Sequence, residues 1–77
     1  MKPDEILNLK GVPCPRNSAI AILKIAGMDT GALLEIIVDD GEPIENVPPS
    51  LEEDDSCSII DKVQGDEGMW HIFVKVK

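Results

Sequence analysis

The order of strand-like and helix-like segments most limits the folds open to this chain of 77 residues. Four short runs have the β-branched or alternating composition of strands, and two longer stretches fit helices. In chain order they are residues 6–9 (strand), 15–26 (helix), 33–38 (strand), 42–54 (helix), 56–63 (strand) and 69–76 (strand). The order β-α-β-α-β-β predicts an α/β two-layer sandwich, with a four-stranded mixed sheet and two helices on one face.

Glycine, proline and aspartate mark the ends and the weak points of these segments. Gly27 is expected to end the first helix. Pro48 and Pro49 lie inside the second helix, and an interior proline removes a helical hydrogen bond, so we expect that helix to be interrupted there. Asp39 and Asp40 are expected to end the second strand and to cap the helix that follows.

The first predicted helix is apolar nearly all the way round, and only Asn17 and Lys24 mark a polar side. At the helical spacing of 100° per residue, the predicted core stripe consists of Ala19, Ile22, Leu23 and Ala26. A helix of this kind cannot bury every face against one sheet. The remaining apolar flank is therefore either covered by the second helix or forms a docking patch for a partner beside Cys14.

The size and the cysteine content indicate one domain in a reducing compartment. A chain this short has a single modest core, so residues 1–77 are predicted to form one monomeric domain. Its two cysteines, Cys14 and Cys57, are far apart in sequence, which favours a reduced, cytoplasmic setting over a disulfide framework. No apolar run is long enough for a signal peptide or a membrane span.

Charge is distributed unevenly along the chain, whose formal net charge is −8. Residues 1–28 carry four basic and two acidic side chains, whereas residues 29–67 carry thirteen acids and one lysine. The acidic part argues against direct contact with nucleic-acid phosphates. It is either a solvated, solubilising surface or a surface that steers toward a basic partner.

Cys14 and Pro15 stand at the start of the first predicted helix. Proline is favoured at the first helical position, which places Cys14 at the N-cap. The positive end of a helix dipole favours a thiolate there, and the neighbouring charges of Lys10 and Arg16 have the same sign. The sequence therefore predicts a nucleophilic thiol at Cys14, with a small buried side chain as the alternative.

The ordered set of motifs resembles the TusA/SirA-like family of small sulfur-carrier proteins. That family has a strand, a Gly-x-x-Cys-Pro-x-Pro segment that opens a helix, a strand ending in Asp-Asp, a helix containing Ile-Pro, and two final strands. The resemblance extends from Ile6 to Val76, although Asn17 replaces the second proline and residues 49–55 replace an aromatic, glycine-containing stretch. The matching residues are Gly11, Cys14, Pro15, Gly31, Leu34, Ile36, Asp39, Asp40, Val47 and Pro48.

The resemblance implies a persulfide relay of the sulfurtransferase type that needs no cofactor. Cys14 would accept sulfane sulfur from a donor protein, such as a cysteine desulfurase or a rhodanese-like protein, and pass it to an acceptor protein. A non-catalytic adaptor of the same fold, docking a partner through the first helix and the acidic face, is the alternative. The residues expected to support Cys14 are Lys10, Gly11, Pro15, Arg16 and Asn17.

Asn17 takes the place of the second proline of the family motif. It falls at the third helical position if Cys14 is the cap, where its side chain is expected to reach back toward the cap backbone. Replacing Asn17 by proline is expected to be tolerated, because a first-turn N–H group has no partner within the helix.

The other candidate residues are expected to be structural. Cys57 is predicted to fill the core of the third strand, with a resolving thiol for Cys14 as the alternative. His71 alternates with apolar residues and is predicted to lie on a sheet surface. Two cysteines and one histidine at wide spacing do not form the usual four-ligand zinc site.

We expect the Cys14 thiol to be exposed and to have a pKa below about 8.5, the value of a free thiol. The rate of its alkylation by iodoacetamide, measured against pH in the folded protein, should therefore have its midpoint below that value. A thiol that reacts only after unfolding would contradict this expectation.

Overall fold

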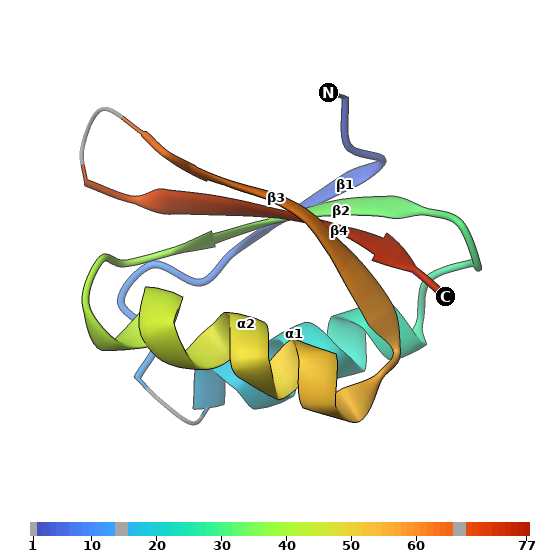
Figure 1. Ribbon diagram of the computed structural model, residues 1–77, viewed down its shortest axis with the longest axis horizontal. Helices are drawn as coiled ribbons and strands as arrows, with labels where there is room; N and C mark the ends of the chain where they lie inside the picture. The colour runs from blue at the N-terminus through green and yellow to red at the C-terminus, as the bar shows by residue number, and fades with distance from the viewer. Residues whose placement is uncertain (1, 14–15, 66–67) are drawn as a thin grey trace.

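The computed structural model describes residues 2–13, 16–65 and 68–77, and it forms the predicted two-layer α/β sandwich (Figure 1). A four-stranded mixed sheet makes one layer, and the two helices make the other. The elements are β1 (Glu5–Asn8), α1 (Arg16–Ala26), β2 (Leu33–Val38), α2 (Glu42–Asp54), β3 (Cys57–Gln64) and β4 (Trp70–Val76). This order confirms the sequence prediction.

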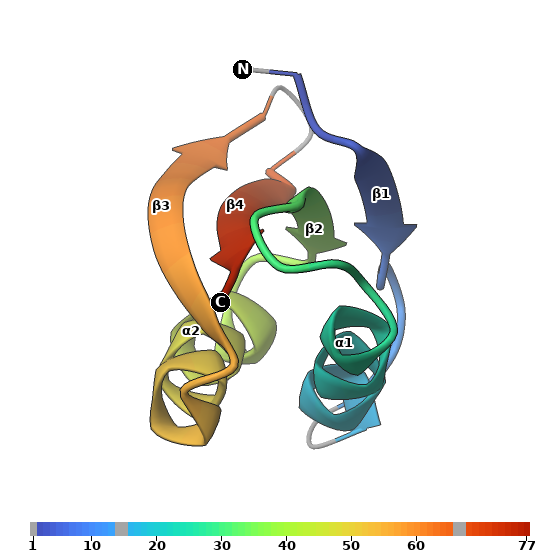
Figure 2. The same ribbon diagram turned by 90° about the vertical axis from the view of Figure 1, so that its right-hand side faces the viewer.

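The sheet has the strand order β1-β2-β4-β3, and its pairing directions set the directions of the helices. β1 is parallel to β2, whereas β4 is antiparallel to both β2 and β3, so β1, β2 and β3 all run the same way. Both helices run in the direction opposite to these strands, and both lie on the same face of the sheet (Figure 2). The β1–α1 and β2–α2 loops and the β3–β4 hairpin therefore lie at one end of the molecule.

The core lies between the sheet and the helices, and alternate residues of β2 form its centre. Leu34, Ile36 and Val38 are 0% exposed. On β4, Val74 pairs with Leu34 and Ile72 pairs with Ile36, and both are fully buried as well. Each such side chain contributes about 1.5–3 kcal/mol on burial, so this alternation fixes the register of the sheet.

The predicted core stripe of α1 is wrong. Leu23 is 73% exposed, Ala19 and Ala26 are exposed as well, and Ile22 is half-buried. The buried residues of α1 are Asn17, Ser18, Ala21 and Ile25.

The rotation of α1 has two physical causes. Because the helix is apolar nearly all round, apolar spacing alone cannot select the buried face. The face that meets the sheet includes the small side chains of Ser18 and Ala21, which let the helix pack closely. The Nζ atom of Lys24 also lies 2.5 Å from Oε1 of Glu5, which ties one side of the helix to β1.

The predicted interruption of α2 is also wrong, because the helix continues from Glu42 to Asp54 with Pro48 and Pro49 inside it. Neither proline has an N–H group to donate to the preceding turn. Val47 and Leu51 are 0% exposed, and Pro48 is buried between them in sequence. The burial of this face against the core offsets the hydrogen bonds that the prolines remove.

Asp55 ends α2 in the left-handed conformation, with φ 59° and ψ 22°. Its N–H group donates to the carbonyl oxygens of Leu51 and Glu52, at 3.2 Å each, and so gives a hydrogen-bond donor to two carbonyl groups of the last helical turn. Its carboxylate binds Nζ of Lys77 at the end of the chain, and this hydrogen bond and charge hold the pKa of Asp55 below its ordinary value. The contact therefore joins the end of α2 to the residue after β4.

We predict that the Asp55–Lys77 pair stabilises the fold at neutral pH but not in acid. A carboxyl with a lowered pKa stabilises above its unfolded pKa, and this contribution is lost as the pH falls through the folded pKa. Asp55→Asn removes the charge and keeps a residue that tolerates the left-handed conformation. Its Tm should lie below that of the wild type at about pH 7, and the gap should close near pH 2. An equal gap at both pH values would contradict the prediction.

Candidate functional site

The candidate site lies at the end of the molecule where β1 leads into α1. Cys14 and Pro15 lie outside the described residues, so the predicted N-cap position and exposure of the thiol stay predictions. The residues on both sides are described, and they determine how the chain enters and leaves the cysteine. The site is therefore built from residues 8–13, from residues 16–18 and from the end of β2.

A tight turn brings the chain from β1 toward Cys14. The N–H group of Leu9 donates to the carbonyl oxygen of Ile37 at 2.8 Å, which extends the pairing of β1 with β2, and Leu9 is 3% exposed. Lys10 N–H donates to Oδ1 of Asn8 at 2.9 Å, and Val12 N–H donates to the carbonyl oxygen of Leu9 at 3.1 Å. The buried leucine and these hydrogen bonds fix the path of the loop.

Gly11 and Asp39 hold this loop against the neighbouring β2–α2 connection. Gly11 has φ +77°, a conformation that favours glycine. Its N–H group donates to Oδ2 of Asp39 at 2.7 Å. This bond joins segments 28 positions apart, at the end of β2 next to the cysteine loop. The Asp39 carboxylate thus helps to position the residues that precede Cys14.

The expectation that Asp39 and Asp40 cap α2 is wrong. The N-cap of α2 is Gly41, and no side chain caps that helix. Asp39 binds Gly11, and Oδ1 of Asp40 accepts a hydrogen bond from Nε1 of Trp70 at 2.9 Å. The sequence contains a signal for the contact with Gly11, because the carboxyl ends of two adjacent parallel strands lie side by side.

Asn17 is 0% exposed, so its assignment to a polar, outward side of α1 is wrong. Its Oδ1 accepts a hydrogen bond from Ser18 N–H at 2.7 Å, and its own N–H group donates to the carbonyl oxygen of Pro13 at 3.1 Å. The second bond spans Cys14 and Pro15. A proline at position 17 would lose this bond, so the premise that this N–H group has no partner is wrong, and tolerance of the substitution stays a prediction. The expected contact with the cap backbone involves Cys14 and lies outside the described residues.

The charged side chains near the site are mostly basic. Lys10 and Arg16 are exposed, and the first turn of α1 contains no acidic residue. Neither Lys10 nor Arg16 belongs to a salt bridge within the described residues. The half-buried Asp39 carboxylate has the opposite sign, but Gly11 N–H compensates part of its charge. An anion at the start of α1 would have two cationic side chains near it in sequence.

Cys57 is a core residue, as predicted. It is 3% exposed and lies opposite Val76 at the start of β3. Burial raises the pKa of its thiol, and the charge of Lys77 offsets only part of this effect. The start of β3 lies at the opposite end of the sheet from the β1–α1 loop, so the described fold gives no support to a resolving role for Cys57.

His71 lies on the sheet face opposite the helices, as predicted. It pairs with Ile37 of β2, and its Nδ1 lies 2.7 Å from Oε2 of Glu35. Within the described ranges, no group of three His, Cys, Asp or Glu side chains could hold a metal ion. None of the helices described is long and apolar enough to cross a membrane.

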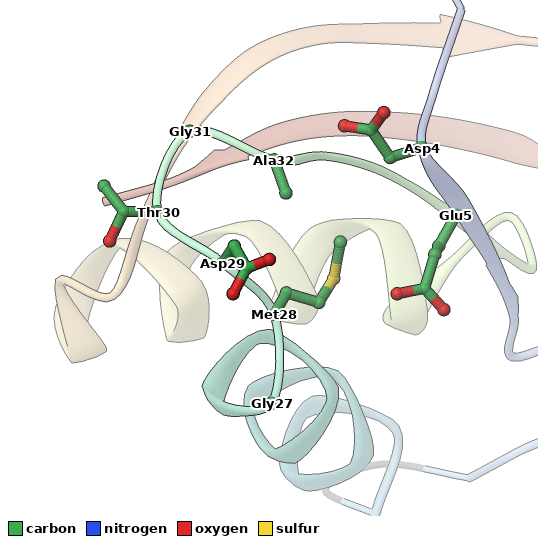
Figure 3. Close-up of a pocket in the computed structure, with 8 residues that line it drawn as sticks. All are labelled: Asp4, Glu5, Gly27, Met28, Asp29, Thr30, Gly31 and Ala32. Atoms are coloured by element: carbon green, nitrogen blue, oxygen red, sulfur yellow. The ribbon is translucent and has the colours of Figure 1, made fainter.

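A pocket of about 550 Å³ lies away from the site, where α1 ends and β2 begins (Figure 3). Three acidic residues line it, but two of them have structural partners. Oδ2 of Asp4 accepts a hydrogen bond from Leu33 N–H at 2.9 Å, and Glu5 pairs with Lys24. These carboxylates stabilise the sheet edge and the position of α1.

Comparisons with known proteins agree with the fold and with the motif. The family model for the sulfurtransferase TusA matches residues 5–76. A protein of Archaeoglobus fulgidus named "Putative sulfur carrier protein" is 27% identical over 77 residues, which are 100% of this chain and 86% of that protein. The crystal structure of a SirA-like protein from Desulfitobacterium hafniense superposes with a TM-score of 0.78 at 17% identity, covering 92% of this chain and 95% of that one.

We predict that Gly11→Ala destabilises the protein by about 1–2 kcal/mol, because alanine is disfavoured in the left-handed conformation. No atom of the described residues lies within 4 Å of a Cβ placed at Gly11, so strain of the backbone accounts for the loss. Gly27→Ala is the matched control, because Gly27 has no positive φ and an added Cβ would make only ordinary contacts, at 3.7 Å and beyond. Chemical denaturation should separate the two variants, and equal stabilities would contradict the strain argument.

Proposed function

This chain belongs to the TusA sulfurtransferase family, and we propose that it is a sulfur carrier that transports sulfane sulfur as a persulfide on Cys14. The observation that carries the proposal is the fixed loop that leads to this cysteine. The Gly11–Asp39 hydrogen bond holds the entry to the loop, and the hydrogen bond from Asn17 to Pro13 closes the segment around Cys14. A carrier thiol needs a fixed and repeatable position, because donor and acceptor must reach the same atom.

The proposed transfer is a thiol–persulfide exchange. The Cys14 thiolate attacks the outer sulfur of a persulfide on the donor protein, and a new S–S bond forms. The donor's own S–S bond breaks, and its electron pair remains on the donor sulfur as a thiolate. Delivery repeats the exchange, with a nucleophile of the acceptor attacking the outer sulfur on Cys14. The sequence of steps needs no external oxidant or reductant.

Charge near the loop supports this chemistry. The thiolate that attacks, and the thiolate that leaves on delivery, are both anions. The start of α1 and the exposed Lys10 and Arg16 favour an anion there, while no acidic side chain occupies the first turn. Gly11, Pro15 and Asn17 are proposed to position the cysteine, and Lys10 and Arg16 to favour its anionic form.

The proposed partners are two proteins, a sulfur donor such as a cysteine desulfurase or a rhodanese-like protein, and a sulfur acceptor. A reducing, cytoplasmic setting suits this role because it keeps the Cys14 thiol free between transfers. The adaptor alternative shares the fold but needs no reactive thiol. Sulfur loading therefore separates the two functions.

We predict that wild type and Cys57→Ala both gain one sulfur atom when incubated with a cysteine desulfurase and cysteine, whereas Cys14→Ser gains none. Intact-protein mass spectrometry without reductant measures the gain. Cys57→Ala should also lose about 1 kcal/mol of stability, because it leaves a small cavity in the core.

Two results would contradict this assignment. Loss of loading in a folded Cys57→Ala variant would place Cys57 in the chemistry. A wild type that never loads, from either class of donor, while still binding a partner, would favour the adaptor.

A further inference from the structure

The exposed face of α1 is apolar and has no partner in the described structure. Leu23 is 73% exposed, and Ala19 and Ala26 share its side of the helix at positions i−4 and i+3. Lys24 is turned toward β1, where it pairs with Glu5. The outside of the helix layer therefore presents an apolar stripe to solvent.

A groove of about 350 Å³ runs beside this stripe, between α1 and α2. Ile22 of α1 and Ser50, Glu53 and Asp54 of α2 line it. The two helices run side by side along the outside of the molecule (Figure 2). The groove therefore has an apolar wall on α1 and an acidic wall on α2.

The acidic wall has no salt-bridge partner in the part of the chain that the structure describes. α2 contains five acidic residues and no basic one. None of the salt bridges among the described residues involves Glu53 or Asp54. Neighbouring carboxylates repel one another, and a cationic partner would relieve this repulsion.

We propose that the α1–α2 groove docks a basic amphipathic helix of a partner protein, with apolar residues on Leu23 and Ile22 and lysine or arginine toward Glu53 and Asp54. Charge complementarity selects this occupant. A second copy of the chain is disfavoured, because each copy has a net charge of −8 and the same acidic wall. This inference rests on the proposed function, because a sulfur carrier must dock its donor and acceptor proteins. It adds the chemistry by which one of these proteins would be recognised.

The groove is placed to serve the site without covering it. α1 has 11 residues and is about 16 Å long. Arg16 is at the end next to Cys14, whereas Leu23 lies about two turns further on. A helix docked along Leu23 would hold its protein against the carrier about two turns away from Arg16, the first residue of α1.

A synthetic peptide of defined sequence tests this proposal. The probe is a fluorescein-labelled helical peptide of about 14 residues, with leucines at helical i, i+3, i+4 and i+7 spacing and lysines on the other face. Its binding to the full chain is measured by fluorescence anisotropy with Cys14→Ser, which cannot carry sulfur. We expect saturable binding that weakens with salt. Leu23→Gln should weaken it about tenfold, and Glu53→Gln with Asp54→Asn about fivefold.

Matched controls separate the groove from bulk charge and general stickiness. Ile6→Gln removes an apolar side chain that is 60% exposed on the opposite face of the sheet, and it should leave binding unchanged. Asp29→Asn with Asp61→Asn removes the same charge at residues that do not line the groove, and it should also leave binding unchanged. A scrambled peptide of the same composition should bind at least about tenfold more weakly, because it cannot form one apolar face.

Several results would overturn the proposal. If the scrambled peptide bound as tightly as the probe, or if the control variants lost as much affinity as the groove variants, the binding would be explained by bulk charge and general stickiness alone. Amide chemical shifts that move around Ile6 and Phe73 rather than along α1 and α2 would place the contact on the open face. Sulfur loading is measured separately. If loading fails while the peptide still binds, only the carrier function is contradicted. If loading succeeds while the peptide does not bind, only the docking groove is contradicted.

Discussion

The burial of alternate side chains of β2 is the constraint on which the rest of the structure depends. Leu34, Ile36 and Val38 are fully buried, and this strand joins the parallel pairing with β1 to the antiparallel pairing with β4. The same strand reaches the candidate site, because the carbonyl oxygen of Ile37 and the carboxylate that follows it bind the loop before Cys14. A one-residue slip of β2 would move both acceptors away from that loop. Core packing and the path of residues 9–11, which precede the cysteine, therefore share one cause.

The sequence predicts the helices and strands of this fold well, because the spacing of apolar residues differs between the two. It does not predict features on which that spacing carries no information. The alternation of Trp70, Ile72, Val74 and Val76 places β4 correctly, with the buried side chains on the helix side. The rotation of α1 could not be predicted, because apolar residues on every side leave the buried face undetermined. The small side chains that allow close approach to the sheet select that face. The continuity of α2 through its two prolines depends on tertiary burial, which local hydrogen-bonding rules do not include. In the site, the motif around Cys14 is visible in the sequence, whereas the contact of Asp39 with Gly11 follows from the sequence only once β1 and β2 are paired in parallel.

Asn17 shows how this chain compensates for the proline that the family motif has at that position. A proline there would restrict the backbone of the first turn through its ring. Among its contacts with the described residues, the N–H group of Asn17 donates across Cys14 and Pro15 to the carbonyl oxygen of Pro13, and its Oδ1 accepts from the N–H group of Ser18. The Ser18 N–H group belongs to the first turn of α1, where donors lack partners within the helix. The start of α1 is thus held by hydrogen bonds, and the burial of Asn17 shields them from water.

A protein with a net charge of −8 can still favour an anion at one end because its charges are separated in space. α2 has 13 residues and is about 20 Å long, whereas the Debye length at physiological ionic strength is about 8 Å. Glu53 and Asp54 lie at the end of α2 away from the β1–α1 loop, so solvent ions screen most of their effect on a thiolate at Cys14. Lys10 belongs to that loop, and Arg16 is the first residue of α1 after it. The acidic groove and the basic side chains of Lys10 and Arg16 therefore act independently, and one small fold presents charges of opposite sign at its two ends.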